Sequence, residues 1–219
     1  MPRRTPPSPG AAARCALLLI DVINDLEFDD GAALLRYARP MARKLAAFKQ
    51  RARAAGVPVI YVNDNFGRWR SDFRALVRHC LHDRVCGAPI ARLLQPQAAD
   101  YFVLKPRHSG FYCTALEVLL GFLQTRVVIL TGLAGDNCVL FTAHDAYMRG
   151  FRVVVPRDCV ASVTQAGNRG ALVHVARYLK ADTRASDVIR FEELMEPTQV
   201  VNGASTLYEP TEGELSARP

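Results

Sequence analysis

The sequence lacks the long hydrophobic segment that a protein needs to cross a membrane as a helix. No apolar run in its 219 residues approaches the ~20 that such a helix requires. Residues 1–14 contain prolines and arginines but no hydrophobic stretch like that of a secretory signal peptide. We therefore expect residues 1–14 to be a disordered leader, and the protein to be cytoplasmic and without a membrane partner.

Regular cysteine spacing and clustered positive charge are also missing. The six cysteines follow no framework pattern, and several lie in apolar segments, which indicates reduced, mostly buried thiols. The net charge is +7, but the arginines are spread over many segments. A nucleic-acid-binding face usually gathers its cations and intersperses aromatic residues among them. We therefore expect no nucleic-acid partner.

Apolar runs alternate with helix-length amphipathic segments, and no internal repeat is evident. Strands are expected over 15–20, 57–62, 101–104, 126–130 and 151–155, with a sixth, edge strand over 187–189. Helices are expected from Pro40 to about residue 55, over 72–81, after a capping box formed by Thr114 and Glu117, over 137–149 and over 165–180. This alternation predicts an α/β fold with a doubly wound, mostly parallel sheet of five or six strands and helices on both faces. We expect one domain over 15–190, and a C-terminal tail or oligomerisation arm over 191–219.

Cys138 lies on the short turn between the buried strand at 126–130 and the helix at 137–149. Ligands of open α/β sheets bind at the carboxyl ends of the strands, where this turn is located. The free N–H groups and the dipole at the start of the helix favour a thiolate over a thiol. The position of Cys138 therefore predicts a nucleophile.

Asp21 and Lys105 also stand at the ends of expected strands. Carboxyl ends of parallel strands face the same way, so these two residues and Cys138 can converge. A carboxylate can accept the thiol proton, a lysine can hold the charged groups, and backbone N–H groups can bind an oxyanion. Each residue alone could simply cap, pack or face solvent. Three together at three strand ends favour an active site.

Three segments that contain these residues resemble motifs of the isochorismatase-like cysteine hydrolases, the superfamily of nicotinamidases and N-carbamoylsarcosine amidohydrolases. Residues 18–25 resemble the opening D-x-x-N-D motif, residues 105–111 resemble the K-x-x-x-S-x-F segment, and residues 132–139 resemble the nucleophile motif. The resemblance extends over about residues 15 to 190.

The resemblance implies a catalytic triad of Asp21, Lys105 and Cys138. It also implies a cis peptide bond between Leu133 and Ala134, and an oxyanion hole formed by the backbone N–H groups of Ala134 and Cys138. The implied reaction cleaves the C–N bond of a small amide or carbamoyl substrate through a thioester, without a cofactor. Family members are usually dimers or tetramers, so a homodimer or homotetramer is expected.

The chain also departs from the family pattern. Nicotinamidases carry a D-x-H segment and a further histidine after the second strand, whereas this chain has Asp64 but no histidine before His79. We therefore predict a metal-independent enzyme with no metal site. Isochorismatases proper lack the nucleophilic cysteine, which argues against vinyl-ether hydrolysis. Gly135 replaces a residue that is often threonine, and Leu26 stands where phenylalanine is usual.

Loop residues near the strand ends are candidates for the substrate pocket, although each could merely pack or cap its loop. The candidates are Phe28, Asp64, Asn65, Trp69, His108 and Tyr112. A local cluster of His79, Cys80, His82 and Cys86 lacks the second ligand pair of a structural zinc site, and we assign it to the polar side of a helix. His144 is interpreted as a packed or exposed helix residue.

The alternative functions are a catalytically silent binding or assembly protein, a nicotinamidase-type enzyme with an atypical metal site, and a thiol redox sensor with a resolving cysteine.

Overall fold

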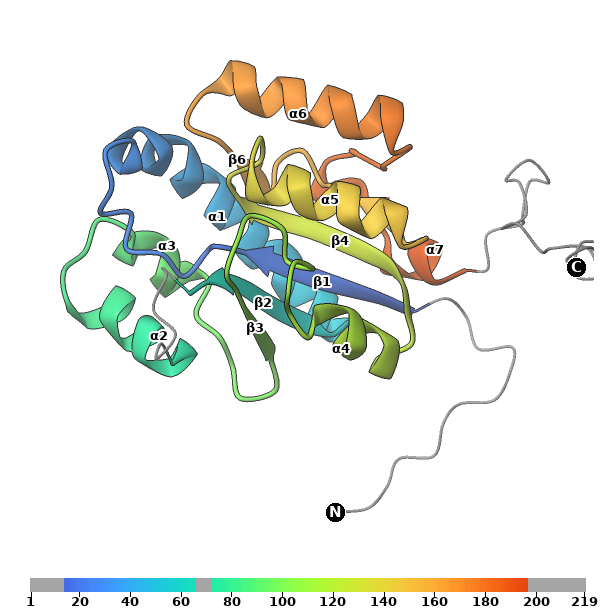
Figure 1. Ribbon diagram of the computed structural model, residues 1–219, viewed down its shortest axis with the longest axis horizontal. Coiled ribbons are helices and arrows are strands. Elements are labelled where there is room, and N and C mark those ends of the chain that lie inside the picture. Colours follow the sequence, from blue (N-terminus) through green and yellow to red (C-terminus); the bar gives the residue numbers. More distant parts are fainter. Residues whose placement is uncertain (1–13, 66–71, 197–219) are drawn as a thin grey trace, which may run out of the picture.

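The computed structural model describes residues 14–65 and 72–196, which form a central sheet flanked by helices (Figure 1). The strands are β1 (Arg14–Ile20), β2 (Val59–Asp64), β3 (Tyr101–Lys105), β4 (Thr125–Leu133), β5 (Arg152–Val154) and β6 (Val160–Ala161). The helices are α1 (Gly31–Ala54), α2 (Phe73–His82), α3 (Ala88–Leu93), α4 (Leu116–Phe122), α5 (Cys138–Met148), α6 (Gln165–Tyr178) and α7 (Phe191–Met195), with a 3₁₀ helix, η1, at Ser186–Val188.

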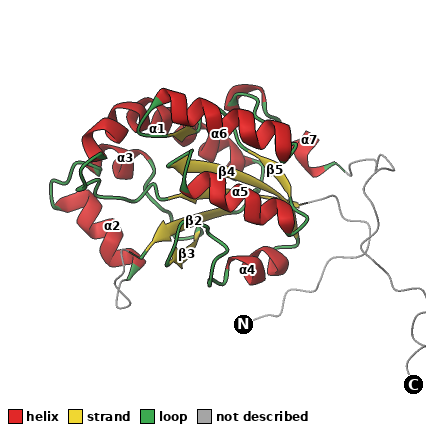
Figure 2. Ribbon diagram, turned by 45° about the horizontal axis from the view of Figure 1, so that its top comes forward, coloured by secondary structure: helices red, strands yellow, loops and turns green. Residues whose placement is uncertain are grey.

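All sheet pairings between the named strands are parallel, in the order β3-β2-β1-β4-β5, and β6 adds to the end of β4. Helices lie on both sides of this sheet (Figure 2). The expected doubly wound α/β fold is therefore confirmed. Because crossovers put helices on both faces, the central strand β1 is apolar on both faces from residue 15 to residue 20.

Strand β1 divides the core into two layers. Leu17 and Leu19 pack with α1, α3 and α7, whereas Leu18 and Ile20 on the opposite face pack with α4, α5 and α6. All four side chains are fully buried. The continuous apolar run at 15–20 thus serves two hydrophobic layers at once.

Helix α1 begins at Gly31, well before the expected start at Pro40. Its apolar face already includes the buried Leu34 and Ala38, and Pro40 lies inside the helix. The apolar repeat of this helix therefore begins before the proline. A proline is a preferred first-turn residue but does not by itself mark a helix start.

Two local predictions are wrong. The expected edge strand over 187–189 is a 3₁₀ turn, because Arg51 donates hydrogen bonds to the carbonyls of Ser186 and Ile189. The sixth strand is instead β6, which pairs with β4. The capping box also fails: Thr114 accepts from the Leu116 N–H, and Glu117 pairs with Arg149 instead.

The expected C-terminal tail begins within the folded core. Phe191 of α7 stacks on Phe48 with ring centroids 5.0 Å apart, and Leu194 is fully buried. Residues 197–219 and most of the expected leader lie outside the described residues. Within the described residues, no helix is long and apolar enough to cross a membrane.

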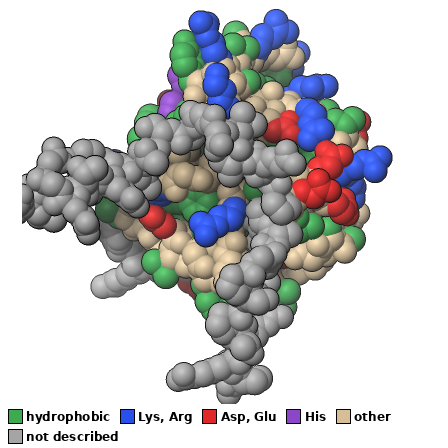
Figure 3. Space-filling view, turned by 90° about the vertical axis from the view of Figure 1, so that its right-hand side faces the viewer, with side chains coloured by type: hydrophobic (Ala, Val, Ile, Leu, Met, Phe, Trp, Pro, Cys, Tyr) green, Lys and Arg blue, Asp and Glu red, His purple; other side chains and the backbone are tan. Residues whose placement is uncertain are grey.

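The strands all end at one edge of the sheet, on the left of Figure 1. Figure 3 views the opposite end of the molecule, where Lys and Arg side chains form separate groups, some of them beside Asp and Glu. The residues expected to form the active site belong to the edge where the strands end.

Candidate active site

Three polar side chains meet at this edge. Asp21 directly follows β1, Lys105 is the last residue of β3, and Cys138 is the first residue of α5, which follows β4. The Lys105 Nζ lies 2.9 Å from an Asp21 carboxylate oxygen and 3.5 Å from the Cys138 Sγ. The structure thus brings together residues that are distant in the sequence.

The backbone of Asp21 turns sharply at the end of β1. Its φ of 51° lies in the left-handed region, which Asp and Asn adopt more readily than most residues. The Asp21 N–H donates to the Val62 carbonyl, and a carboxylate oxygen accepts from the Asp64 N–H at 2.7 Å. These contacts hold the carboxylate beside Lys105.

Gly132 permits the close approach of β4 to β1 at the site. Its φ is 106°, and a Cβ there would lie 2.1 Å from the Ile20 carbonyl oxygen. A side chain would therefore force the two strands apart next to Asp21. The cis peptide bond expected between Leu133 and Ala134 is present just beyond this glycine.

Two residues hold the turn before Cys138: Ala161, which ends β6, and Ser162, which follows it. The Gly135 N–H donates to the Ala161 carbonyl at 2.8 Å, and the Asp136 N–H donates to Ser162 Oγ at 3.0 Å. Among the described residues, no backbone carbonyl accepts from the N–H of Ala134 or Cys138. The oxyanion hole that the resemblance implies at these two N–H groups stays a prediction.

Charges at the site are buried and coupled. Lys105 is fully buried. Burial alone would lower its pKa, but Asp21 and Cys138 outweigh this effect, so the pKa of Lys105 is raised. Burial raises the pKa of Asp21, and Lys105 opposes the increase. The carboxylate is consequently more basic than an exposed one while a cation beside it still favours its charged form.

The electrostatics favour a protonated Cys138 in the resting site. Burial, followed by the charge of Asp21, raises its pKa to about 12, and Lys105 only partly compensates. Desolvation and the neighbouring carboxylate thus act against the helix start, which by itself favours a thiolate. The site thus holds a thiol beside a carboxylate.

Two of the candidate pocket residues have side-chain contacts with Lys105 or Cys138. His108 Nδ1 lies 3.9 Å from Cys138 Sγ, and an Asp64 carboxylate oxygen lies 3.5 Å from Lys105 Nζ. Asn65 is buried and donates its N–H to the Lys105 carbonyl, so it supports β3 beside the site.

The other candidates are less closely placed. Phe28 and Tyr112 are 48% and 55% exposed, and within the described residues neither hydrogen-bonds to the triad nor stacks on another ring. Trp69 lies outside the described residues. The sequence analysis missed Phe141, whose ring centroid is 5.4 Å from that of His108. Its spacing could have identified it, because residues three apart on a helix share a face and Phe141 follows Cys138 by three.

The metal independence expected from the sequence stays a prediction. Asp64 faces the Lys105 ammonium, and in the described parts of the chain no group of three or more His, Cys, Asp or Glu side chains could hold a metal ion. The residues of the His79–Cys86 cluster do not all lie on the polar side of α2, where the sequence placed them. His79 contacts Asp83 and Asp25, whereas Cys80 is fully buried rather than on the polar side of α2.

Comparisons with known proteins agree with this architecture. Residues 15–188 match the Isochorismatase domain family. The uncharacterised isochorismatase family protein YaaI of Bacillus subtilis (strain 168) is 41% identical over 80% of this chain and 95% of its own length. Maleamate amidohydrolase of Pseudomonas putida is 26% identical over 89% of this chain and 91% of its own. The crystal structure of N-carbamoylsarcosine amidase from Thermoplasma acidophilum has a TM-score of 0.63, with 28% identity over 81% of this chain and 99% of that one.

Proposed function

Because the chain belongs to the isochorismatase family, we propose that it is a metal-independent cysteine hydrolase that cleaves the C–N bond of a small amide or carbamoyl compound. The observation that carries the proposal is the convergence of Asp21, Lys105 and Cys138 at three strand ends. Amidohydrolases among the relatives, such as maleamate amidohydrolase, support the reaction class.

The proposed reaction begins with proton transfer from the Cys138 thiol to Asp21. Sγ attacks the carbonyl carbon, and the carbonyl oxygen becomes an oxyanion that the N–H groups of Ala134 and Cys138 stabilise. The tetrahedral intermediate collapses to a thioester. The C–N bond breaks as the leaving nitrogen takes the proton from Asp21, which releases ammonia or an amine.

The second half of the reaction uses the same base. Asp21 takes a proton from water, and the resulting hydroxide attacks the thioester carbon. The C–S bond breaks, the carboxylic or carbamic acid leaves, and Sγ regains the proton from Asp21. Lys105, 2.9 Å from Asp21, favours the ionised carboxylate at the start of each half.

His108 and Asp64 are proposed to line the pocket because both have side-chain contacts with the triad. Phe141, whose ring lies against His108, extends this wall on the α5 side. An imidazole and an aromatic ring suit a small substrate with a flat or unsaturated acyl group. Maleamate and N-carbamoylsarcosine are therefore the first compounds to test.

The test is ammonia release from a panel of maleamate, N-carbamoylsarcosine, nicotinamide and simple aliphatic amides. At least one should be hydrolysed, and Cys138→Ala should reduce the rate by about a thousandfold or more. Cys113→Ala is the matched control, because this exposed thiol lies outside the triad and its removal should leave the rate unchanged. Mass spectrometry should detect an acyl group on Cys138 during turnover.

Full activity of Cys138→Ala would contradict the proposed nucleophile. Hydrolysis of nicotinamide that is lost with a chelator and restored by zinc would favour the nicotinamidase alternative. A chain that hydrolyses nothing in the panel, and whose Cys138 forms no acyl adduct, would favour a silent binding protein.

We also propose that the protein works as a homodimer or homotetramer. Large apolar side chains on α4 and α5, among them Val118, Phe122 and Met148, are more than 70% exposed and could be buried between copies. Light scattering coupled to size-exclusion chromatography should give a mass of two or four chains. A single-chain mass at micromolar concentration would contradict this.

A further inference from the structure

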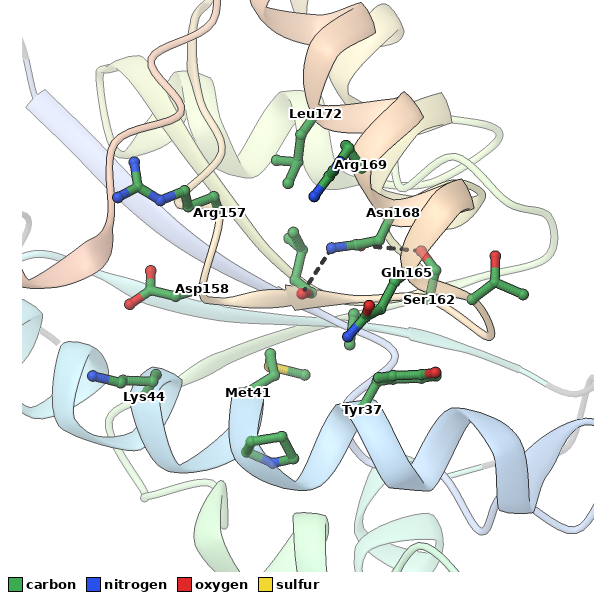
Figure 4. Close-up of a pocket in the computed structure, with 14 residues that line it drawn as sticks. Tyr37, Met41, Lys44, Arg157, Asp158, Ser162, Gln165, Asn168, Arg169 and Leu172 are labelled. Carbon is green, nitrogen blue, oxygen red and sulfur yellow. Dashed lines mark hydrogen bonds between the residues drawn. The ribbon is translucent and has the colours of Figure 1, made fainter.

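A cavity of about 660 Å³ lies between α1 and α6, and none of Asp21, Lys105 and Cys138 lines it. In Figure 4, α1 forms its lower wall, α6 forms its upper right wall, and β6 lies between them. The volume is in the range of small-molecule sites in proteins. The cavity is therefore large enough to hold a metabolite.

Positive charge dominates the lining. Lys44 of α1, Arg157 of the β5–β6 connection and Arg169 of α6 all border the cavity (Figure 4). Among the described residues, none of these three side chains forms an ion pair. Unneutralised cations on separate walls create a positive potential in the space between them. Such a space favours an anion.

The one carboxylate in the lining, Asp158, offsets one of these three positive charges and leaves an excess of positive charge. Asp158 accepts hydrogen bonds from the N–H and the hydroxyl of Ser186, at 2.7 and 2.9 Å. Both of its oxygens are thus already hydrogen-bonded to Ser186, which is not a lining residue. Arginine guanidinium groups can bind carboxylate or phosphate oxygens in pairs, which suits Arg157 and Arg169.

Apolar and amide groups complete the lining. Tyr37 and Met41 line the α1 wall and Leu172 lines the α6 wall, while Gln165 and Asn168 of α6 supply amide groups (Figure 4). We propose that this cavity is a second binding site, which takes a small carboxylate or phosphate monoester that carries an apolar group. The cations bind the charged end, and the α1–α6 walls bind the apolar end.

The site is connected to the turn before Cys138. Ser162 Oγ accepts from the Asp136 N–H at 3.0 Å and donates to Asn168 Oδ1 at 3.1 Å, and both Ser162 and Asn168 line the cavity. An occupant that contacts Asn168 therefore alters the environment of the Asp136 amide. That amide reports occupancy without any measurement of activity.

The experiment titrates the ¹⁵N-labelled full chain with phenyl phosphate and with benzoate at constant ionic strength. At least one probe should shift the amide signals of Asp136 and Asn168 with a Kd below ~10 mM. Arg157→Gln/Arg169→Gln should raise that Kd by about tenfold or more, and Lys44→Gln should raise it by a smaller factor. Arg177→Gln, on the same helix but outside the cavity, is the matched control and should leave it unchanged.

Phenol, which lacks the anionic group, should bind at least about tenfold more weakly than phenyl phosphate. The proposal is overturned if neither anion shifts the two signals, if the double variant binds as tightly as the wild type, or if phenol binds as tightly as phenyl phosphate. Amide hydrolysis is measured separately, and its absence would not bear on this result because no triad residue lines the cavity.

Discussion

Cys138 carries its proton at neutral pH, because burial raises the pKa of the thiol to about 12. In the proposed reaction, such a thiol needs a base that takes its proton at the moment of attack. Burial also raises the pKa of Asp21, which brings the carboxyl closer in basicity to the thiolate it must form. The two groups are thus better matched than an exposed carboxyl and a buried thiol would be.

Asp21→Asn should make the Cys138 thiol more acidic and at the same time slow amide hydrolysis. The loss of the carboxylate removes a charge that raises the thiol pKa and leaves Lys105, which lowers it. Alkylation of Cys138 by iodoacetamide at pH 7 should therefore become about tenfold faster, which corresponds to a one-unit fall in pKa. Amide hydrolysis should fall at least about a hundredfold, because the base is gone.

Peptide mass spectrometry measures the alkylation, with Cys113 of the same chain as the internal reference. In the wild type, Cys138 should react slowly at pH 7, and its rate should rise about tenfold per pH unit toward pH 9, since both values lie below its pKa. Slower alkylation in Asp21→Asn than in the wild type would show that Asp21 does not raise the thiol pKa.

At the scale of elements, α6 packs closely against the turn that precedes Cys138. A Cβ on Gly135 would lie 2.2 Å from Asn168 Oδ1 and 3.1 Å from Ser162 Oγ. Asn168 thus fills the space that a side chain at position 135 would need. The glycine that departs from the family pattern is therefore matched by the residue opposite it on α6.

Gly135→Ala should lower the free energy of unfolding by about 1–3 kcal/mol, because the added methyl group overpacks this contact. In an Asn168→Ala background the same change should cost less than about 0.5 kcal/mol, since the clashing oxygen is absent. Urea unfolding of the wild type, the single variants and the double variant measures this coupling. Equal costs in both backgrounds would show that the two residues do not compete for space.

Helices α5 and α6 also meet through a histidine pair, in which His144 Nε2 lies 3.0 Å from His174 Nε2. Burial, and then the charge of His174, lowers the pKa of His144 from 6.5, and Asp145 opposes this shift. The folded state therefore disfavours protonation of His144. Its contribution to stability is complete well above pH 6.5 and decreases as the pH falls below that value.

We expect the free energy of unfolding to decrease from pH 7.5 to pH 5.5, and to decrease less in His144→Gln. Urea unfolding at the two pH values measures the difference. The exposed His82 supplies the control, since His82→Gln should show the same decrease as the wild type. An identical decrease in His144→Gln would assign the pH dependence to other groups.

At the scale of the whole molecule, the order of strands and helices followed from the apolar pattern. A run such as 15–20 is buried on both faces, so only a central parallel strand accounts for it. The positions of Asp21, Lys105 and Cys138 followed because parallel strands end at one edge. The sequence pattern was sufficient to predict an element wherever its buried residues recur at regular intervals.

Other features depend on contacts between distant segments, which a local pattern does not contain. The turn at 186–188 replaces a strand because Arg51, on α1, binds the carbonyls of Ser186 and of Ile189, the residue after the turn. The raised pKa of Cys138 depends on how deeply three separate segments bury it. The cavity between α1 and α6 likewise exists only once both helices are placed.

The extent of the domain can be tested at α7, which the sequence assigned to a tail. Phe191→Ala removes a ring that stacks on Phe48, so it should lower the free energy of unfolding by about 3–5 kcal/mol. The neighbouring exposed Glu192→Ala should stay within about 0.5 kcal/mol of the wild type. Denaturant unfolding compares the two, and similar small costs would mean that α7 is an appendage to the core.

Lys105 ends β3, a strand at one margin of the sheet that is paired on one side by β2 within the described residues. A margin strand can separate from its neighbour at a smaller free-energy cost than a central one. Partial opening of β3 would withdraw the ammonium from Asp21 while β1 and β4 remain paired. Mild heating or low denaturant should then abolish amide hydrolysis reversibly before the protein unfolds. The range of temperature and denaturant in which it is active should therefore be narrower than the range in which it is folded.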